Sequence, residues 1–151
     1  MPHFADLSAN TCFGQWEDVL VSIGWLDSTH GYARGAVPLE VFRALVRLLV
    51  DPWQPGVFAG RSPCSLCRFS GGPGVFVFEG SNVQLGSANL FVPSIDKKVF
   101  VAPSLVAHYI DAHAYMPPEE FQAAVVRCPP MGSLSYRKAL LERGIRAAKV
   151  D

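Results

Sequence analysis

The chain has 151 residues, of which 50% are hydrophobic and 17% charged, and its 13 acidic side chains balance 13 basic ones. This composition argues against a disordered chain, and the zero net charge argues against non-specific binding to nucleic acid or anionic lipid. The length suits one domain, so we expect residues 1–151 to form a single domain. No run approaches the ~18 apolar residues that span a bilayer, and no secretory signal is recognisable, so we expect a cytoplasmic protein with no membrane contact.

The first half of the chain predicts one short strand and one amphipathic helix. The segment VLVSIGWLD, residues 19–27, is rich in β-branched and aromatic residues and contains a glycine breaker, which is typical of a strand. In VPLEVFRALVRLLVD, residues 37–51, apolar side chains recur at helical spacing, and a proline and a glutamate stand in the first turn. We therefore expect a helix in this second segment.

The second half predicts three strands and three helices. Three β-like runs, VFVFEG, VQLGSANLFVP and KKVFVAP, lie within residues 75–103 and are separated by turn-forming tripeptides, which favours an antiparallel meander. The segments PSLVAHYIDAH and PPEEFQAAVVRC begin with prolines and continue with apolar side chains at helical spacing. A last helix is expected from Ser135 to Ala148.

Cys64 and Cys67 form a Cys-x-x-Cys pair in RSPCSLCRFSGGPG. In a reducing compartment such a pair binds a metal or undergoes redox chemistry more often than it forms a structural disulfide. A thioredoxin-like redox pair needs a helix beginning at the second cysteine, and the glycines and proline that follow Cys67 disfavour one.

The Pro-Cys-x-x-Cys order also matches half of the nucleobase deaminase signature, but no histidine upstream is followed by the glutamate that these enzymes require. The deaminase is therefore excluded.

Two histidines downstream can complete a metal site. His108 and His113 have four residues between them, which lies within the spacing of histidine pairs in zinc modules. Positions five residues apart differ by about 140° around an ideal helix, so the two imidazoles converge only if the helix loosens or ends near His113. Asp111 could replace His113 as a ligand or orient a histidine. We predict a Zn²⁺ ion bound by Cys64, Cys67, His108 and His113.

The alternative for these cysteines is a packing role, because free cysteines are often buried as small apolar side chains. Packing is the expectation for Cys12 and Cys128, which have no partner motif. With the zinc site included, the predicted fold class is α+β, a small antiparallel β-meander with a zinc knuckle flanked by three to four helices. We expect the zinc-clasped unit at about residues 61–116.

The order of several motifs resembles a family of small uncharacterised bacterial proteins. The resemblance covers about residues 19–127 and is carried by IGWLD, VPLEVFRAL, the Cys-x-x-Cys pair, ANLFVP and HYIDAHAYMPPEEF. Members pair Cys-x-x-Cys with an H-Y-x-x-x-H-x-Y-x-P-P-x-E-F segment, which implies that Cys64, Cys67, His108 and His113 belong to one shared site. This chain lacks the Phe-His that members tend to carry before the first cysteine. The resemblance implies no established activity.

Three classes of function are compatible with such a site. Two cysteines and two histidines leave no open position on zinc, which favours a non-catalytic protein-interaction module, such as an immunity or adaptor protein that binds another protein. A zinc-dependent hydrolase would need a missing ligand, with Asp111 or Glu79 as general base. A zinc-containing nucleic-acid-binding protein is disfavoured by the neutral charge. No catalytic residue is assigned, and Trp53, Tyr109 and Tyr115 are candidates for either a contact surface or the core.

Overall fold

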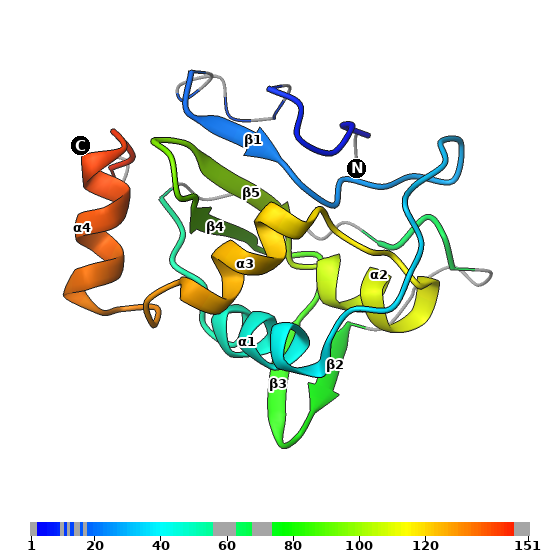
Figure 1. Cartoon of the computed structure of the whole chain (residues 1–151). Coiled ribbons are helices and arrows are strands. Elements are labelled where there is room, and N and C mark those ends of the chain that lie inside the picture. Colours follow the sequence, from blue (N-terminus) through cyan, green and yellow to red (C-terminus); the bar gives the residue numbers. More distant parts are fainter. Residues whose placement is uncertain are drawn as a thin grey trace.

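The computed structural model describes residues 3–9, 11, 13, 16, 18–55, 63–67 and 74–146 (Figure 1). Its helices are α1 (Leu39–Leu49), α2 (Val106–His113), α3 (Glu119–Arg127) and α4 (Leu134–Glu142). Its strands are β1 (Leu20–Ser22), β2 (Val75–Phe78), β3 (Ser81–Gln84), β4 (Asn89–Pro93) and β5 (Val99–Pro103). The fold class is α+β, as the sequence predicts. The packing role expected for Cys12 concerns a residue outside those described.

The strands divide into two sheets. One sheet has the order β1-β5-β4, with β1 parallel to β5 and β4 antiparallel to it, and the other is the antiparallel pair β2-β3. The single meander expected from the sequence is therefore interrupted between β3 and β4. Gly86 lies at this interruption with a φ of 80°, and its N–H donates to the Ser104 hydroxyl at 2.9 Å. This left-handed turn carries the chain from one sheet to the other.

The β4-β5 pair is covered on both faces, because its side chains alternate between two buried clusters. On one face the strand residues pack with α1, α2 and α3, and on the other with α4 and with Phe13 and Trp25, which flank β1 (Figure 1). The first face carries Leu90, Val92, Phe100 and Ala102, and the second carries Phe91, Val99 and Val101. A strand buried on both faces reads as a continuous apolar run, which is why NLFVP and VFVAP show no polar alternation.

Buried polar atoms on the second face find partners in the strands. The indole N–H of Trp25 donates to the Val101 carbonyl at 3.0 Å, and the Tyr136 hydroxyl donates to the Phe91 carbonyl at 2.6 Å. These bonds fix the segment after β1 against β5 and fix α4 against β4, and they leave neither ring with an unsatisfied donor.

Two elements are shorter than predicted. The first strand ends at Ser22 because Gly24 adopts a φ of 73°, and a Cβ at Gly24 would lie 3.1 Å from Cγ2 of Val106. The last helix ends at Glu142, before the predicted end at Ala148, because Gly144 adopts a φ of 87°. Residues 147–151 lie outside those described.

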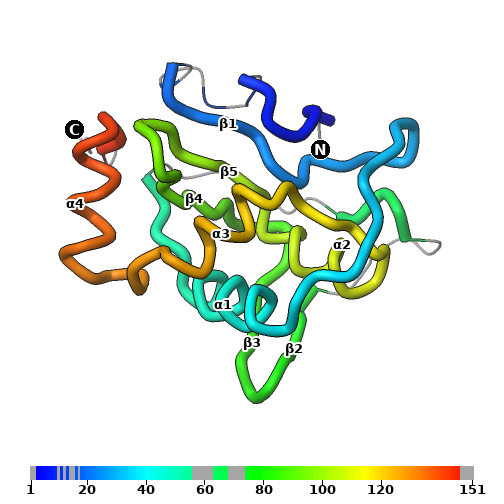
Figure 2. The backbone as a smooth tube through the Cα atoms, viewed as in Figure 1, coloured from blue at the N-terminus to red at the C-terminus, as the bar shows by residue number. Residues whose placement is uncertain are grey.

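The β2-β3 hairpin projects from the body beside α1 (Figure 2). Its turn residues Glu79 and Gly80 both have positive φ, 48° and 81°, which is typical of the two-residue turns that suit a twisted hairpin. Phe76 and Phe78 pack against Phe42 of α1, with ring centroids 5.8 and 4.9 Å away. One face of the hairpin is thus fixed to α1.

Among the described residues, no helix has both the length and the apolar character needed to cross a membrane.

Candidate metal centre

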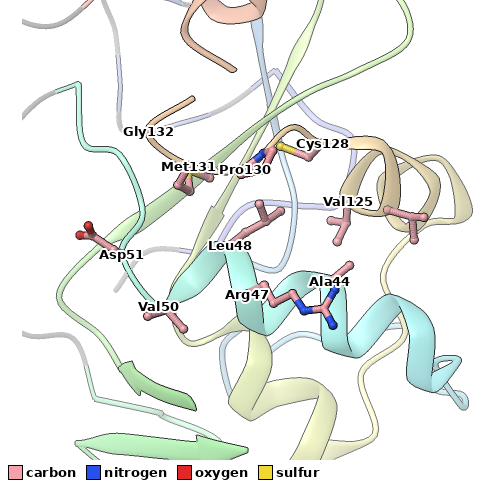
Figure 3. Close-up of a pocket in the computed structure, with 11 residues that line it drawn as sticks. Ala44, Arg47, Leu48, Val50, Asp51, Val125, Cys128, Pro130, Met131 and Gly132 are labelled. Atoms are coloured by element: carbon pink, nitrogen blue, oxygen red, sulfur yellow. The ribbon is translucent and has the colours of Figure 1, made fainter. Parts of the chain in front are cut away.

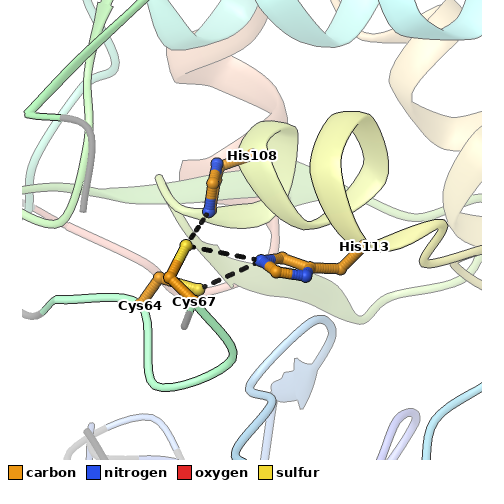
Figure 4. Close-up of side chains that lie close together, drawn as sticks. All are labelled: Cys64, Cys67, His108 and His113. Atoms are coloured by element: carbon orange, nitrogen blue, oxygen red, sulfur yellow. Dashed lines mark hydrogen bonds between the residues drawn. The ribbon is translucent and has the colours of Figure 1, made fainter. Parts of the chain in front are cut away.

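The four side chains predicted as ligands lie together (Figure 4). Their donor atoms are all within 4.8 Å of one another. Cys67 Sγ lies 3.2 Å from His108 Nε2 and 3.6 Å from His113 Nε2, and Cys64 Sγ lies 3.5 Å from His113 Nε2. Two sulfurs and two imidazole nitrogens form a candidate metal site of the N2S2 type.

The end of α2 explains how two histidines five residues apart can meet. The N–H of Ala114 donates to the Tyr109 carbonyl, five residues earlier, so the last turn is wider than an α-helical turn. Ala114 itself adopts a left-handed conformation with a φ of 53°, and His113 is the last helical residue. The wider turn brings His113 round toward His108, and their rings meet at 86° with centroids 5.0 Å apart. The predicted helix end near His113 is confirmed.

The segment before α1 holds this helix end in place. The Tyr32 hydroxyl donates to the His113 carbonyl at 2.9 Å, and the N–H of Gly35 donates to the Ala114 carbonyl at 3.0 Å. A Cβ at Gly35 would lie 2.6 Å from the sulfur of Met116, so a larger residue there would require the Met116 side chain to move. The close backbone approach at Gly35 therefore supports the position of His113.

A buried tyrosine ties the same region to the N-terminal segment. Tyr115 is fully buried, and its hydroxyl lies 2.9 and 2.8 Å from the two carboxylate oxygens of Asp6. The N–H of Gly24 also donates to Asp6, at 2.9 Å. Burial, reinforced by the Asp6 charge, raises the pKa of Tyr115, so the hydroxyl stays protonated and acts as a donor.

The electrostatics of the site favour the neutral forms of Cys64, His108 and His113 in the metal-free protein. Burial raises the pKa of the Cys64 thiol, and the backbone N–H groups of Leu66 and Cys67 partly offset this effect by stabilising its thiolate. Burial lowers the pKa of His108, with a smaller contribution from His113, and burial also lowers the pKa of His113. Neutral imidazoles keep the nitrogen lone pair that a metal needs, whereas a metal must displace the proton of the Cys64 thiol.

The acidic residues considered as general bases lie elsewhere. Asp111 is exposed and is not part of the group of converging donor atoms. Glu79 lies at the turn of the β2-β3 hairpin, where its carboxylate pairs with Arg43 at 2.8 Å. No carboxylate belongs to the N2S2 group in the described part of the chain.

Two of the three aromatic residues considered for a contact surface belong to the core. Tyr109 and Tyr115 are both 0% exposed, and the half-buried ring of Trp53 packs against Tyr136 with centroids 6.3 Å apart. Tyr109 and Tyr115 are therefore core residues and not part of a contact surface, whereas Trp53 lies half-buried at the edge of the core. Helical spacing alone could have separated Tyr109 from the exposed Asp111, since the two positions lie on different faces of α2.

A separate cavity of about 410 Å³ lies between α1, α3 and the chain after α3 (Figure 3). Most of its lining is apolar, and Arg47, Asp51 and Cys128 supply its titratable groups. Burial raises the pKa of the Cys128 thiol to about 12, so this cysteine is an unreactive thiol at neutral pH. The packing role expected for Cys128 agrees with its place against the core.

Comparison with known proteins yields a family and no closer relative. No curated protein and no solved structure matches the chain. A family model described as a domain of unknown function, DUF7919, matches residues 2–126. This agrees with the resemblance to an uncharacterised family, whose bacterial origin and shared motifs stay predictions. Because the match spans most of the sequence, the chain belongs to the DUF7919 family of domains of unknown function.

Proposed function

We propose that the chain is a zinc-stapled, non-catalytic protein-interaction domain. The observation that supports it most is the spacing of the four donor atoms. A tetrahedral zinc ion with Zn–S near 2.3 Å and Zn–N near 2.0–2.1 Å requires S···N separations of about 3.6 Å. Three of the four S···N distances, at 3.2, 3.5 and 3.6 Å, lie close to this value.

The donor set favours a structural zinc over a catalytic one. Two thiolates and two imidazoles fill the four positions of a tetrahedral ion, so no position is left for a water or a substrate. A hydrolytic zinc needs an open position and a nearby base, and the described N2S2 group includes no carboxylate. The staple therefore holds the 63–67 segment to α2 without supplying chemistry.

The hairpin offers the surface best suited to a protein partner. Val75 and Val77 of β2 are 44% and 63% exposed, while the alternating residues Phe76 and Phe78 face α1. Such alternation leaves an apolar outer face on a strand that projects from the body. Partner binding is the role that we assign to this face.

The register of the hairpin also directs the backbone of these two valines outward. Phe78 and Ser81 flank the two-residue turn and form the first hydrogen-bonded pair. Pairs alternate along an antiparallel ladder, so Val77 and Val75 occupy non-hydrogen-bonded positions, and their N–H and C=O groups point away from β3. An extended segment of another protein can pair with this edge as a third strand.

Replacing Val77 by lysine tests the interaction, because a charge on an edge strand opposes strand addition. Proteins retained by the immobilised wild-type chain would be identified by mass spectrometry, and the strongest would be purified for calorimetry. We expect Val77→Lys to weaken its binding at least about tenfold, equivalent to ~1.4 kcal/mol. The control Leu134→Lys changes a side chain that is 86% exposed on α4 and should leave the affinity unchanged.

Equal binding by wild type, Val77→Lys and Leu134→Lys would contradict the assignment of the β2 edge. Failure of any purified protein to bind would contradict the interaction function itself. Neither result would bear on the zinc site, whose occupancy is measured separately.

A further inference from the structure

We propose that His3, Asp27 and His30 form a second metal site, which binds a divalent transition ion through two imidazoles and one carboxylate. One donor atom from each side chain lies within 4.8 Å of the others. These residues are separate from the N2S2 centre, and the proposal does not depend on the interaction function.

One carboxylate oxygen joins the two histidines. His30 Nδ1 lies 2.7 Å from Oδ1 of Asp27, and His3 Nδ1 lies 3.9 Å from the same oxygen. The backbone N–H groups of Thr29 and His30 donate to this oxygen at 3.2 and 3.1 Å. The turn after β1 is thereby fixed, with its carboxylate facing both rings.

The nitrogen of His3 is available to a metal. The His3 Nδ1 atom is buried and has no hydrogen-bond partner among the described residues. Its ring stacks on His30, with centroids 3.9 Å apart and planes within 4° of parallel. The nitrogen lone pairs of stacked rings lie in two separate parallel planes and do not meet at one point, so binding requires one ring to tilt. The side chain of His30 is 55% exposed and can make this movement.

The donor types indicate the class of ion. Imidazole nitrogens together with one carboxylate suit zinc, cobalt or nickel. The thiolates of the N2S2 centre instead favour softer metal ions. Three protein ligands leave at least one position open. Asp27 and His30 also line a cavity of about 450 Å³ that extends to Arg34 and His113. A water or a small anion bound to the metal can occupy this cavity.

The test uses tag-free protein already loaded with one equivalent of Zn²⁺, titrated with Co²⁺ and followed by calorimetry and visible absorption. We expect a second equivalent to bind with ligand-field bands and without a thiolate charge-transfer band. Outer-sphere partners of a metal change its affinity 10–100-fold, so loss of a ligand in His30→Ala should weaken Co²⁺ binding by at least about 100-fold. His3→Ala should do the same.

Ser28→Ala is the matched control, because Ser28 lies in the same turn, is exposed and offers no ligand atom to the site. It should keep Co²⁺ affinity within a few-fold of wild type. The proposal is overturned if the zinc-loaded protein binds no cobalt, if His30→Ala and His3→Ala keep wild-type affinity, or if Ser28→Ala loses as much affinity as they do. The first equivalent of zinc is measured in the same samples, so failure of the N2S2 centre would be seen independently.

Discussion

Replacing Cys64 by serine is expected to remove the zinc and to leave the chain largely unfolded at 25 °C. A structural zinc contributes about 10–16 kcal/mol of apparent binding free energy, whereas the whole free energy of unfolding of a domain is about 5–15 kcal/mol. Cys64 is 7% exposed and its sulfur lies 3.5 Å from His113 Nε2, so a serine there loses a thiolate ligand within a packed site. Circular dichroism and urea unfolding, with zinc measured on the same sample, would check this result.

Cys128→Ser is the control for Cys64→Ser. The Cys128 thiol is partly buried and lies outside the N2S2 group, with its sulfur 3.4 Å from the Pro129 carbonyl. Its replacement should keep the zinc and change the free energy of unfolding by about 1 kcal/mol. Equal zinc content and equal stability in both variants would contradict a structural role for the metal.

Replacing Tyr115 by phenylalanine is expected to lower the free energy of unfolding by about 1.5–3 kcal/mol, the range for a hydrogen bond to a charged group. The variant removes the hydroxyl that donates to Asp6 but keeps the buried ring. Zinc should still bind, because the Tyr115 hydroxyl contacts no ligand. Urea unfolding of the zinc-loaded protein would measure the loss.

Tyr32→Phe provides the comparison for Tyr115→Phe. Its hydroxyl donates to the neutral carbonyl of His113 from a partly buried position, so its removal should cost only about 0.5–1.5 kcal/mol. If Tyr115→Phe were no less stable than Tyr32→Phe, the Asp6–Tyr115 pair would not be the tie between the N-terminal segment and the chain after α2 that the geometry indicates.

The candidate ligands could be predicted because their spacing is local within each pair. Cys64 and Cys67 form a Cys-x-x-Cys knuckle. His108 and His113 form a pair near the end of a helix, and the prolines that follow predict this end. The spacing did not reveal how the imidazoles converge. That depends on the hydrogen bond from Ala114 to the Tyr109 carbonyl, which widens the turn, and on the pairing of Gly35 with Ala114.

Long-range pairings were the least predictable part of the fold. The parallel pairing of β1 with β5 joins Leu20 to Val99, and no local pattern encodes it. The expected meander failed at Gly86, because strand-forming residues on both sides of a turn do not specify whether the two strands share a sheet. His3, Asp27 and His30 likewise show no motif spacing, and only the folded chain brings His3 to the turn after β1.

X-ray absorption spectroscopy of the purified chain at the zinc edge tests the zinc staple most directly. At one equivalent of zinc per chain, we predict a first shell of two sulfurs at about 2.3 Å and two nitrogens at about 2.0–2.1 Å. An absence of zinc, or a first shell in which oxygen replaces a sulfur or an imidazole nitrogen, would contradict a closed site made by Cys64, Cys67, His108 and His113.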